Sequence, residues 1–402
     1  MAFEPLKGYR VIDVTQVLAG PFCSYQLGLL GAEVIKIEPP EGGDWARLGG
    51  LDSELENLGM ATSFLTQNAG KQSIAIDLKN PSGLELVKRL VKTADIFIEN
   101  FRPGTAARLG LGAEQIMSLK PDIVYASLSA FGQDGPMGQR PAYDHVIQAV
   151  SGIMMLTGDP KTLPNKVGSP YIDYSAGQNA AMAVLAALIQ RDKTGQGQRV
   201  DVAMLDSALL LMASHLTQAT TTGKAPEAAG NNAFSGSAAS GVFDTADGKL
   251  ALAANNERQA QRLAEAIGQP DLLQNPLYET PSGRRANSVA FKEILATAFL
   301  SDTASNWELR LADANVPAAK ILSFDETLRL PQIEVREILS EHNIEGSKRK
   351  TKAPTLGFKV NGDRPRAKSP PPLLGRDTEK LLKELGLTAE EISALKQAKV
   401  VA

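Results

Sequence analysis

The first 130 residues alternate between short apolar runs and longer segments with a helical spacing of apolar positions. We predict strands at five apolar, mostly β-branched runs: 10–15, 33–38, 73–77, 96–99 and 123–127. Segments with a helical spacing of apolar positions lie between them. The first ends near Leu30, and two others cover 81–92 and 113–119. Strands joined by crossovers of this length form parallel sheets with helices on both faces. The pattern therefore predicts a doubly wound α/β domain.

The pattern changes in the second half of the chain. We predict an Ala-rich helix over 178–190 and a second helix that ends near residue 217. The segment 220–240 follows, and it is rich in small and polar residues, as loops and linkers are. A hairpin turning at Asp247-Gly248, three helical segments and a C-terminal section ending in two helices follow, the last with Thr388 and Glu391 at capping-box spacing. We expect the N-terminal part of a large domain over 1–218, a small α+β domain over 219–325, and a C-terminal part returning to the large domain over 326–402.

Composition narrows the class of protein. A chain of 402 residues suggests about two domains, and a net charge of −3 argues against a nucleic-acid surface built on bulk charge. The single cysteine, Cys23, excludes an internal disulfide framework, and the three histidines, at 145, 215 and 342, have no metal-ligand spacing. The apolar run 203–214 is too short to span a bilayer, and no signal leader precedes the first strand. We expect a cytoplasmic protein without a metal site or a membrane or nucleic-acid partner.

The candidate for chemistry is Asp173, within the segment 168–177, Gly-Ser-Pro-Tyr-Ile-Asp-Tyr-Ser-Ala-Gly. It lies where the Ala-rich helix must begin, so one interpretation is an N-cap. The other is a carboxylate nucleophile that the positive end of the helix dipole keeps ionised. The residues alone leave both interpretations open.

Other polar side chains cluster at the predicted carboxyl ends of strands, where α/β sheets bind ligands. Gln16 follows the first strand, and the run from Glu99 to Gly104, Glu-Asn-Phe-Arg-Pro-Gly, follows a later one. No Gly-x-Gly-x-x-Gly follows the first strand and no Walker-type loop is present, so a dinucleotide cofactor is unsupported.

Several segments together resemble the family III coenzyme A transferases, the formyl-CoA transferase and carnitine CoA-transferase group. The similarity extends over nearly the whole chain and includes these runs: Ala19-Gly20-Pro21, Gly31–Glu38, Asn80–Gly83, Glu99–Gly104, Arg140–Asp144, Asp201–Asp206 and Pro372–Gly375. The resemblance implies a CoA-binding doubly wound domain formed by both chain ends, a small domain between them, and an interlocked homodimer. It also implies coenzyme A as part of an acyl-CoA substrate rather than a tightly bound cofactor.

Under this resemblance Asp173 matches the family's nucleophilic aspartate, which accepts the acyl group as a mixed anhydride and then becomes an aspartyl-CoA thioester. Gln16 matches a position for a polar contact with the reacting carboxyl. The implied CoA contacts are Lys71, Asn100, Phe101, Arg102, Arg108, Arg140 and Tyr143. Some members carry an arginine where this chain has Pro39-Pro40, so we expect Arg47 or another base to replace it, or one phosphate to be held less tightly.

Three alternatives to intermolecular transfer between an acyl-CoA and a free acid remain. They are an intramolecular CoA-transferring isomerase, an α-methylacyl-CoA racemase and a CoA-binding protein without catalysis. The racemases, by resemblance, share a histidine at the position where this chain has Tyr143. Tyrosine is a poor second base near neutral pH, which disfavours the racemase alternative. We expect succinyl-CoA as donor and a short dicarboxylate as acceptor. Residues 235–240 are either a lid that excludes water or a plain surface loop.

Overall fold

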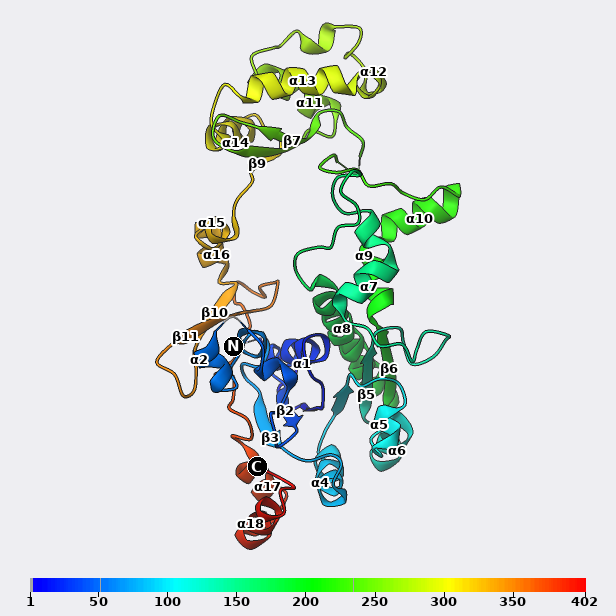
Figure 1. Cartoon of the computed structure of the whole chain (residues 1–402), viewed down its shortest axis with the longest axis vertical. Coiled ribbons are helices and arrows are strands. Elements are labelled where there is room, and N and C mark those ends of the chain that lie inside the picture. The colour runs from blue at the N-terminus through cyan, green and yellow to red at the C-terminus, as the bar shows by residue number, and fades with distance from the viewer. Residues whose placement is uncertain (1–2, 51, 234) are drawn as a thin grey trace. The chain divides into compact units, whose positions relative to one another are not determined.

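Six parallel strands form the main sheet of the computed structural model, which describes residues 3–50, 52–233 and 235–402 (Figure 1). Their bounds are β1 (Arg10–Asp13), β2 (Glu33–Glu38), β3 (Gln72–Ala75), β4 (Ile96–Glu99), β5 (Val124–Ser129) and β6 (Gln198–Ala203). Their order in space is β3-β2-β1-β4-β5-β6, so the predicted parallel α/β sheet is confirmed. The chain reverses its direction of winding between β1 and β4, and ligands of such sheets bind at that switch point.

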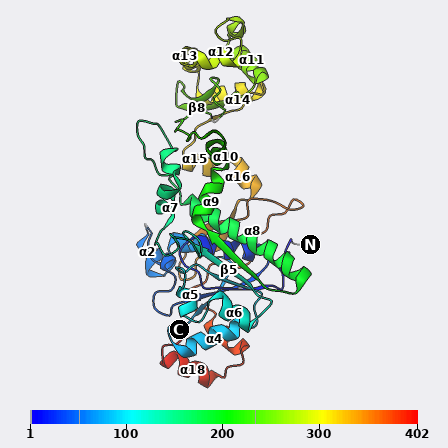
Figure 2. The same cartoon turned by 90° about the vertical axis from the view of Figure 1, so that its right-hand side faces the viewer.

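Helices cover both faces of this sheet and give it two apolar cores. One face packs against α1 (Ala19–Leu29) and the 24-residue α8 (Tyr171–Thr194), with Val11, Ile98 and Val184 fully buried between them. The other face packs against α4 (Pro81–Val91) and α6 (Ala113–Leu119), around the stacked rings of Phe97 and Tyr125. Figure 2 shows α8 and α4 on opposite sides of β5.

Short elements connect these layers. They are η1 (Trp45–Arg47), α2 (Ser53–Asn57), α3 (Thr62–Leu65), α5 (Thr105–Arg108), α7 (Asp144–Ser151), η2 (Ile153–Met155), α9 (Met204–Leu211) and α10 (Ala213–Thr222). The long α8 starts seven residues before the predicted helix, at Tyr171 rather than Gln178. Asp173 therefore lies inside the first turn of the helix.

The C-terminal section packs beside β3. It contains α16 (Pro331–Arg336), the hairpin of β10 (Leu339–Asn343) and β11 (Lys350–Pro354), α17 (Thr378–Glu384) and α18 (Ala389–Gln397). The Asp77 N–H donates to Val400 O at 2.9 Å, and Leu381, Leu382 and Ile392 bury their side chains in the core that contains Ile74. Thr388 and Glu391 form the predicted capping box.

The chain divides into two compact units. The first comprises residues up to Ile153, 167–221 and 331–402, and the second comprises 154–166 and 222–330. The second unit has an antiparallel sheet of β7 (Ser240–Asp244), β8 (Lys249–Ala253) and β9 (Ala318–Lys320), so the predicted hairpin at Asp247-Gly248 is present. Its helices are α11 (Glu257–Ala266), η3 (Leu272–Gln274), α12 (Pro281–Ala286), α13 (Ser288–Phe299), α14 (Ala304–Asp313) and α15 (Phe324–Leu328).

Aromatic side chains fill the core of the second unit. Trp307 packs edge-on against Phe299, with ring centroids 5.1 Å apart, and its indole N–H donates to Phe299 O at 2.8 Å. No helix in the described part of the chain combines the length and the apolar character needed to cross a bilayer.

Candidate active site

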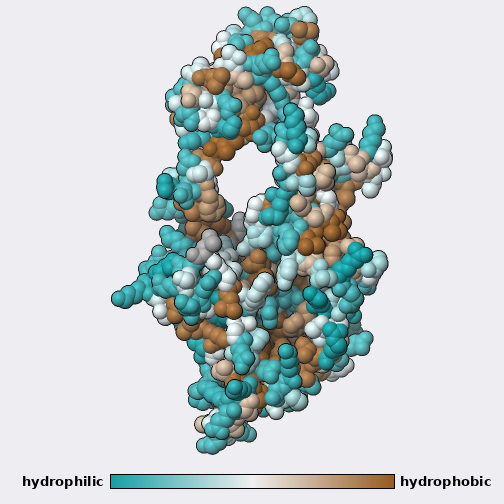
Figure 3. All heavy atoms as spheres, in the orientation of Figure 1, coloured by the Kyte–Doolittle hydropathy of each residue, from teal (hydrophilic) through white to brown (hydrophobic). Residues whose placement is uncertain are grey.

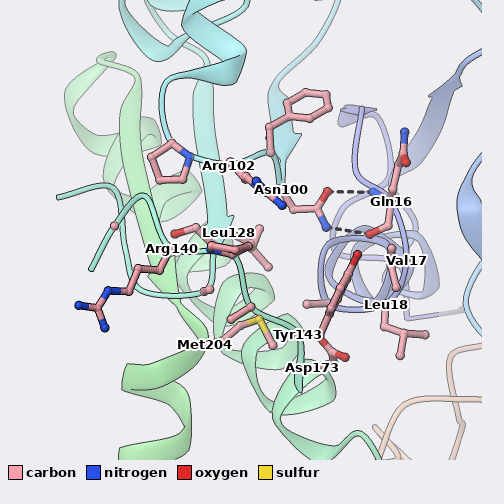
Figure 4. Close-up of a pocket in the computed structure, with 18 residues that line it drawn as sticks. Gln16, Val17, Leu18, Asn100, Arg102, Leu128, Arg140, Tyr143, Asp173 and Met204 are labelled. Atoms are coloured by element: carbon pink, nitrogen blue, oxygen red, sulfur yellow. Dashed lines mark hydrogen bonds between the residues drawn. The ribbon is translucent and has the colours of Figure 1, made fainter. Parts of the chain in front are cut away.

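A cavity of about 280 Å³ lies in the first unit, at the carboxyl ends of β1, β4 and β5 (Figure 4). It is at the switch point of the sheet, as expected for a ligand site. Seven of the nine predicted site residues line it: Gln16, Asn100, Phe101, Arg102, Arg140, Tyr143 and Asp173. The two that do not are Lys71 and Arg108.

Asp173 enters this cavity from the first turn of α8. Pro170 occupies the N-cap position and makes no side-chain cap, and the Asp173 carboxylate does not cap the helix either. That function belongs to the buried Asp144 of α7, whose Oδ2 accepts the N–H groups of Ile172 at 2.9 Å and Asp173 at 3.3 Å. The N-cap interpretation of Asp173 is therefore wrong, and its carboxylate is free to face the cavity.

The electrostatic surroundings oppose ionisation of Asp173. Burial, and then the negative charge of Asp144, raise its pKa to about 7. Among the described residues no cation offsets these two effects. The expectation that the helix dipole keeps this group ionised therefore fails, because Asp144 already satisfies the first N–H groups of α8 and adds a like charge. Near neutral pH both protonation states of Asp173 are populated.

Asp144 contacts the start of α8 beside Asp173, and sequence reasoning did not single it out. It was visible only as the last member of the Arg140–Asp144 run, directly after Tyr143. Gln148 Nε2 donates to its Oδ1 at 2.6 Å, so the carboxylate is held from both sides. An Asp at the first position of one helix carries no sequence signal that it caps a different helix.

Opposite Asp173, the turn from β1 into α1 forms another wall of the cavity. Asn100 holds Gln16 by two hydrogen bonds, accepting its N–H at 2.9 Å and donating to its carbonyl at 2.7 Å (Figure 4). The side-chain amide of Gln16 extends away from Asp173 in this view. The main-chain N–H groups of Leu18 and Ala19, at the start of α1, have no hydrogen-bond acceptor among the described residues.

Aromatic and basic groups surround the outer part of the cavity. The Tyr143 side chain is 56 % exposed, and its ring centroid lies 6.2 Å from that of Trp45. Arg102 and Arg140 are exposed at the cavity wall. Arg108, on α5, is exposed outside it and donates to Thr105 Oγ1 at 2.8 Å.

Two of the predicted bases are committed elsewhere. Lys71 is only 1 % exposed, and its ammonium donates to Asp13 Oδ2 at 3.1 Å, Ser24 Oγ at 2.8 Å and Pro21 O at 2.9 Å. All three of its N–H groups are therefore used, and the predicted CoA contact is wrong. Arg47 is also buried and forms a bidentate ion pair with Glu38. It therefore does not replace the phosphate-binding arginine that some family members carry where this chain has Pro39-Pro40.

The chemistry available in the cavity is that of one carboxylate. Among the described residues that line the cavity, Asp173 is the only carboxylic acid and none is a histidine. His145 is exposed on α7 and outside the lining. Racemisation requires two groups that exchange protons on opposite faces of a carbon, and the only other titratable acid here is the phenol of Tyr143. The lining fits covalent catalysis by a carboxylate better than two-base proton exchange.

Comparison with known proteins points to one enzyme family. The sequence model described as CoA-transferase family III matches residues 6–378. A succinate–glutarate CoA-transferase of Agrobacterium fabrum is 38 % identical over 336 residues, 83 % of this chain and 84 % of the relative. A succinyl-CoA–D-citramalate CoA-transferase of Chloroflexus aurantiacus is 35 % identical over 409 residues, 99 % of this chain and 98 % of the relative. The crystal structure of a CAIB/BAIF family protein from Brucella suis superposes with a TM-score of 0.84 at 32 % identity, over 96 % of this chain and 100 % of that one.

Proposed function

The chain belongs to CoA-transferase family III, and we propose that it moves coenzyme A from succinyl-CoA to a short dicarboxylate through a covalent intermediate on Asp173. That it transfers CoA between an acyl-CoA and a carboxylic acid follows from its family and relatives. The finer choice of acids is supported by the names of two relatives, which act on succinyl-CoA or succinate with glutarate or D-citramalate.

The observation that best supports the covalent route is that the Asp173 carboxylate has no cationic partner among the described residues. Asp173 is the one carboxylate of the described cavity lining, no cation neutralises it, and Asp144 occupies the helix terminus in its place. A carboxylate without a cation is a stronger nucleophile than a salt-bridged one. A structural carboxylate at this depth would be expected to have such a partner.

Each half-reaction exchanges one acid for CoA. An oxygen of ionised Asp173 attacks the acyl carbonyl of the donor, the C–S bond breaks, and CoA leaves as thiolate, so that the acyl group and Asp173 form a mixed anhydride. The thiolate then attacks the Asp173 carbonyl carbon, which gives the aspartyl-CoA thioester and releases the donor acid with an oxygen from Asp173. The acceptor carboxylate repeats these steps in reverse, leaving one of its own oxygens on Asp173.

The turn opposite Asp173 supplies hydrogen-bond donors for these steps. Both carbonyl carbons pass through tetrahedral oxyanions, which preorganised N–H groups stabilise. We assign this function to the main-chain N–H groups of Leu18 and Ala19, which have no acceptor in the described structure. Gln16 then contributes through its backbone position, since its side-chain amide extends away from Asp173 (Figure 4).

Coenzyme A occupies the outer part of the cavity in this proposal. Arg102, Arg108 and Arg140 are exposed and available to its phosphates, while Phe101 and Tyr143 offer apolar surface to the adenine and pantetheine portions. Asn100 acts on the turn through its two bonds to Gln16 rather than on CoA directly.

The first unit also exposes apolar surface that suits a second copy of the chain. The large exposed side chains are Val150, Met182, Ile189, Leu210, Leu211 and Leu216, on α7, α8, α9 and α10. Figure 3 shows hydrophobic side chains gathered near α7 and α9. Exposed apolar side chains gathered on neighbouring helices are typical of a surface that another protein chain covers. We propose that a homodimer, interlocked as in the family resemblance, covers this surface.

The segment 235–240 belongs to the second unit, and its function as a lid stays a prediction. Asn255 Oδ1 accepts hydrogen bonds from Ser235 Oγ at 2.8 Å and Ser240 Oγ at 3.1 Å, so one amide holds both ends of the segment. A cytoplasmic location also remains a prediction.

Oxygen transfer in a single turnover tests the covalent route. With enzyme in excess over succinyl-CoA and with [¹⁸O]glutarate as acceptor, we expect ¹⁸O in the peptide that contains Asp173 and none in the released succinate. Direct attack of glutarate on succinyl-CoA would instead place ¹⁸O in succinate at once and leave Asp173 unlabelled. Transfer within one acyl-CoA, as in an isomerase, would proceed without glutarate.

A further inference from the structure

Val17 has a backbone conformation that a valine rarely adopts. Its φ is +71°, in the left-handed region, where a β-branched side chain is strained. Glycine adopts this region without strain and is the usual residue at such a turn. The strain at Val17 is therefore maintained by the surrounding structure, and such positions cluster at functional sites.

Side chains from distant segments hold the main chain on both sides of Val17. Each of five consecutive main-chain polar groups, from Thr15 O to Val17 O, forms a hydrogen bond with a side chain. Lys36 Nζ donates to Thr15 O at 2.7 Å, and the Asn100 amide accepts Gln16 N–H at 2.9 Å and donates to Gln16 O at 2.7 Å. Asp44 Oδ1 accepts Val17 N–H at 2.9 Å, and Gln67 Nε2 donates to Val17 O at 2.6 Å. None of these groups bonds to another main-chain group in the described structure. The turn is thus shaped by its partners and not by its own hydrogen bonds.

The partners are themselves fixed. Asp44 and Gln67 are fully buried, and the Asp44 carboxylate also accepts the Ala46 N–H at 2.9 Å and pairs with Lys36 at 2.8 Å. The Asp44 N–H donates to Glu38 Oε2 at 2.9 Å, which ties the loop to the end of β2. A side chain held this firmly transmits its position to the turn.

The position of the turn is coupled to that of Asp173. Gly177 lies one helical turn after Asp173 on the same face of α8. A Cβ at Gly177 would lie 2.6 Å from Ala19 O, so α8 touches the main chain just after the turn with no room to spare. A displacement of the turn would therefore change the distance between its N–H groups and Asp173.

We propose that Asp44, Gln67 and Asn100 form a turn clamp, a set of positioning residues that forces Val17 into its strained conformation and thereby aims the N–H groups of Leu18 and Ala19 at the carbonyl formed on Asp173. This inference rests on the proposed function, because it assigns the clamp to the covalent step.

Gln67 and its neighbour Asn68 give a matched pair of variants. Both follow α3, both are fully buried, and each donates one hydrogen bond to a main-chain carbonyl, Gln67 to Val17 O and Asn68 to Phe64 O at 2.8 Å. Gln67→Met and Asn68→Leu remove these bonds and keep most of the side-chain volume. Only the bond from Gln67 holds the turn from β1 into α1.

The experiment measures thermal stability, steady-state kinetics with succinyl-CoA and glutarate, and the rate of CoA attachment to Asp173 by quenched mass spectrometry. For Gln67→Met we expect kcat and the attachment rate to fall about a hundredfold, the loss that misplacement by an ångström causes, with KM for succinyl-CoA unchanged. Asn68→Leu should lose similar thermal stability and keep the wild-type rates. Equal rates for the two variants would overturn the clamp.

Val17→Gly provides a second test, since it removes the strain without touching a clamp residue. We expect its melting temperature to rise and its attachment rate to fall below that of Val17→Ala, which loses the side chain but keeps the strain. A stabilised Val17→Gly protein that attaches CoA as fast as Val17→Ala would overturn the clamp. If the wild type transfers CoA but never carries it on Asp173, the covalent route fails, and the kcat comparison of Gln67→Met with Asn68→Leu still decides whether the clamp positions the turn.

Discussion

Two aspartates of the first unit, Asp13 and Asp173, show opposite electrostatic behaviour. Asp13 is fully buried at the end of β1, and burial opposes its ionisation. The ammonium groups of Lys71 and Lys36 and the hydroxyls of Ser24 and Thr15 outweigh burial and hold its pKa at about 2. Asp173 has no such partners among the described residues, and burial with the charge of Asp144 raises its pKa to about 7.

The difference shows that the partners of a carboxylate, more than its burial, decide its function. The hydrogen bonds and ion pairs of Asp13 leave no lone pair for chemistry, and they fix the strand that leads into the active-site turn. The carboxylate oxygens of Asp173 remain available to a substrate. A group with a raised pKa in a cavity is a candidate for catalysis, whereas a group with a lowered pKa in an ion-pair network is more often structural.

The largest expected effect is the loss of CoA transfer when Asp173, and not Asp13, is replaced. Asp173→Asn cannot form an anhydride or a thioester, so we expect CoA transfer to fall by at least about 10³-fold, as when other covalent nucleophiles are removed. The variant should remain folded. Steady-state exchange between succinyl-CoA and glutarate measures the loss, and exchange within tenfold of wild type would contradict the assignment.

Asp13→Asn should affect folding instead. It leaves the buried Lys71 ammonium without its counterion, which costs about 3–5 kcal/mol when a buried pair is broken. Chemical denaturation measures the change in the free energy of unfolding. Ser24→Ala is the control: it removes the hydroxyl that donates to Asp13 and accepts from Lys71 but leaves the ion pair intact, and it should cost about 1.5–3 kcal/mol.

Stability should depend on pH in opposite ways for the two groups. The folded pKa of Asp173 is above that of the unfolded chain, so the folded protein binds more protons between about pH 4 and pH 7, and the free energy of unfolding falls as pH rises through this window. Asp173→Asn lacks this penalty and should be more stable than wild type by up to about 4 kcal/mol at pH 8, with the difference vanishing near pH 4. Asp13, with its pKa at about 2, contributes stability that is present above the unfolded pKa and lost in acid.

The pH profile of transfer should report Asp173 directly. Because only the ionised carboxylate attacks, kcat/KM should rise with pH to a plateau, with a midpoint near 7. Asp144→Asn removes the neighbouring negative charge and retains an oxygen for the Ile172 N–H, so the midpoint should move to lower pH. An unchanged midpoint would show that Asp144 does not act on Asp173.

The sequence predicted the parts of this site that follow local rules. Short, mostly β-branched apolar runs located the strands, and polar residues after them placed Gln16, Asn100 and Arg102 at one edge of the sheet. The strands alone could not show that Lys71 turns inward, because its partner Asp13 is 58 residues away and the side chain of Lys71 carries no signal of burial.

Contacts between distant segments account for the remaining misses. One of the two interpretations of Asp173 was an N-cap of α8, whereas Asp144 caps this helix from 29 residues upstream. The three clamp residues come from loops that are 27, 50 and 84 residues from their bonded positions in the turn. No periodicity or local motif encodes such a convergence, and Val17 gave no sign of its left-handed backbone because valine is usually a strand residue.

The most direct test of the account is the covalent state of Asp173 in the presence of succinyl-CoA alone. With no acceptor acid, the wild-type protein should accumulate CoA as a thioester on the peptide that contains Asp173, detected by peptide mass spectrometry and released by hydroxylamine, while succinate appears in equal amount. Asp13→Ser, assayed below its melting temperature, should carry the same adduct, and Asp173→Asn should carry none. Turnover without any adduct on Asp173, or an adduct on another side chain, would contradict the account.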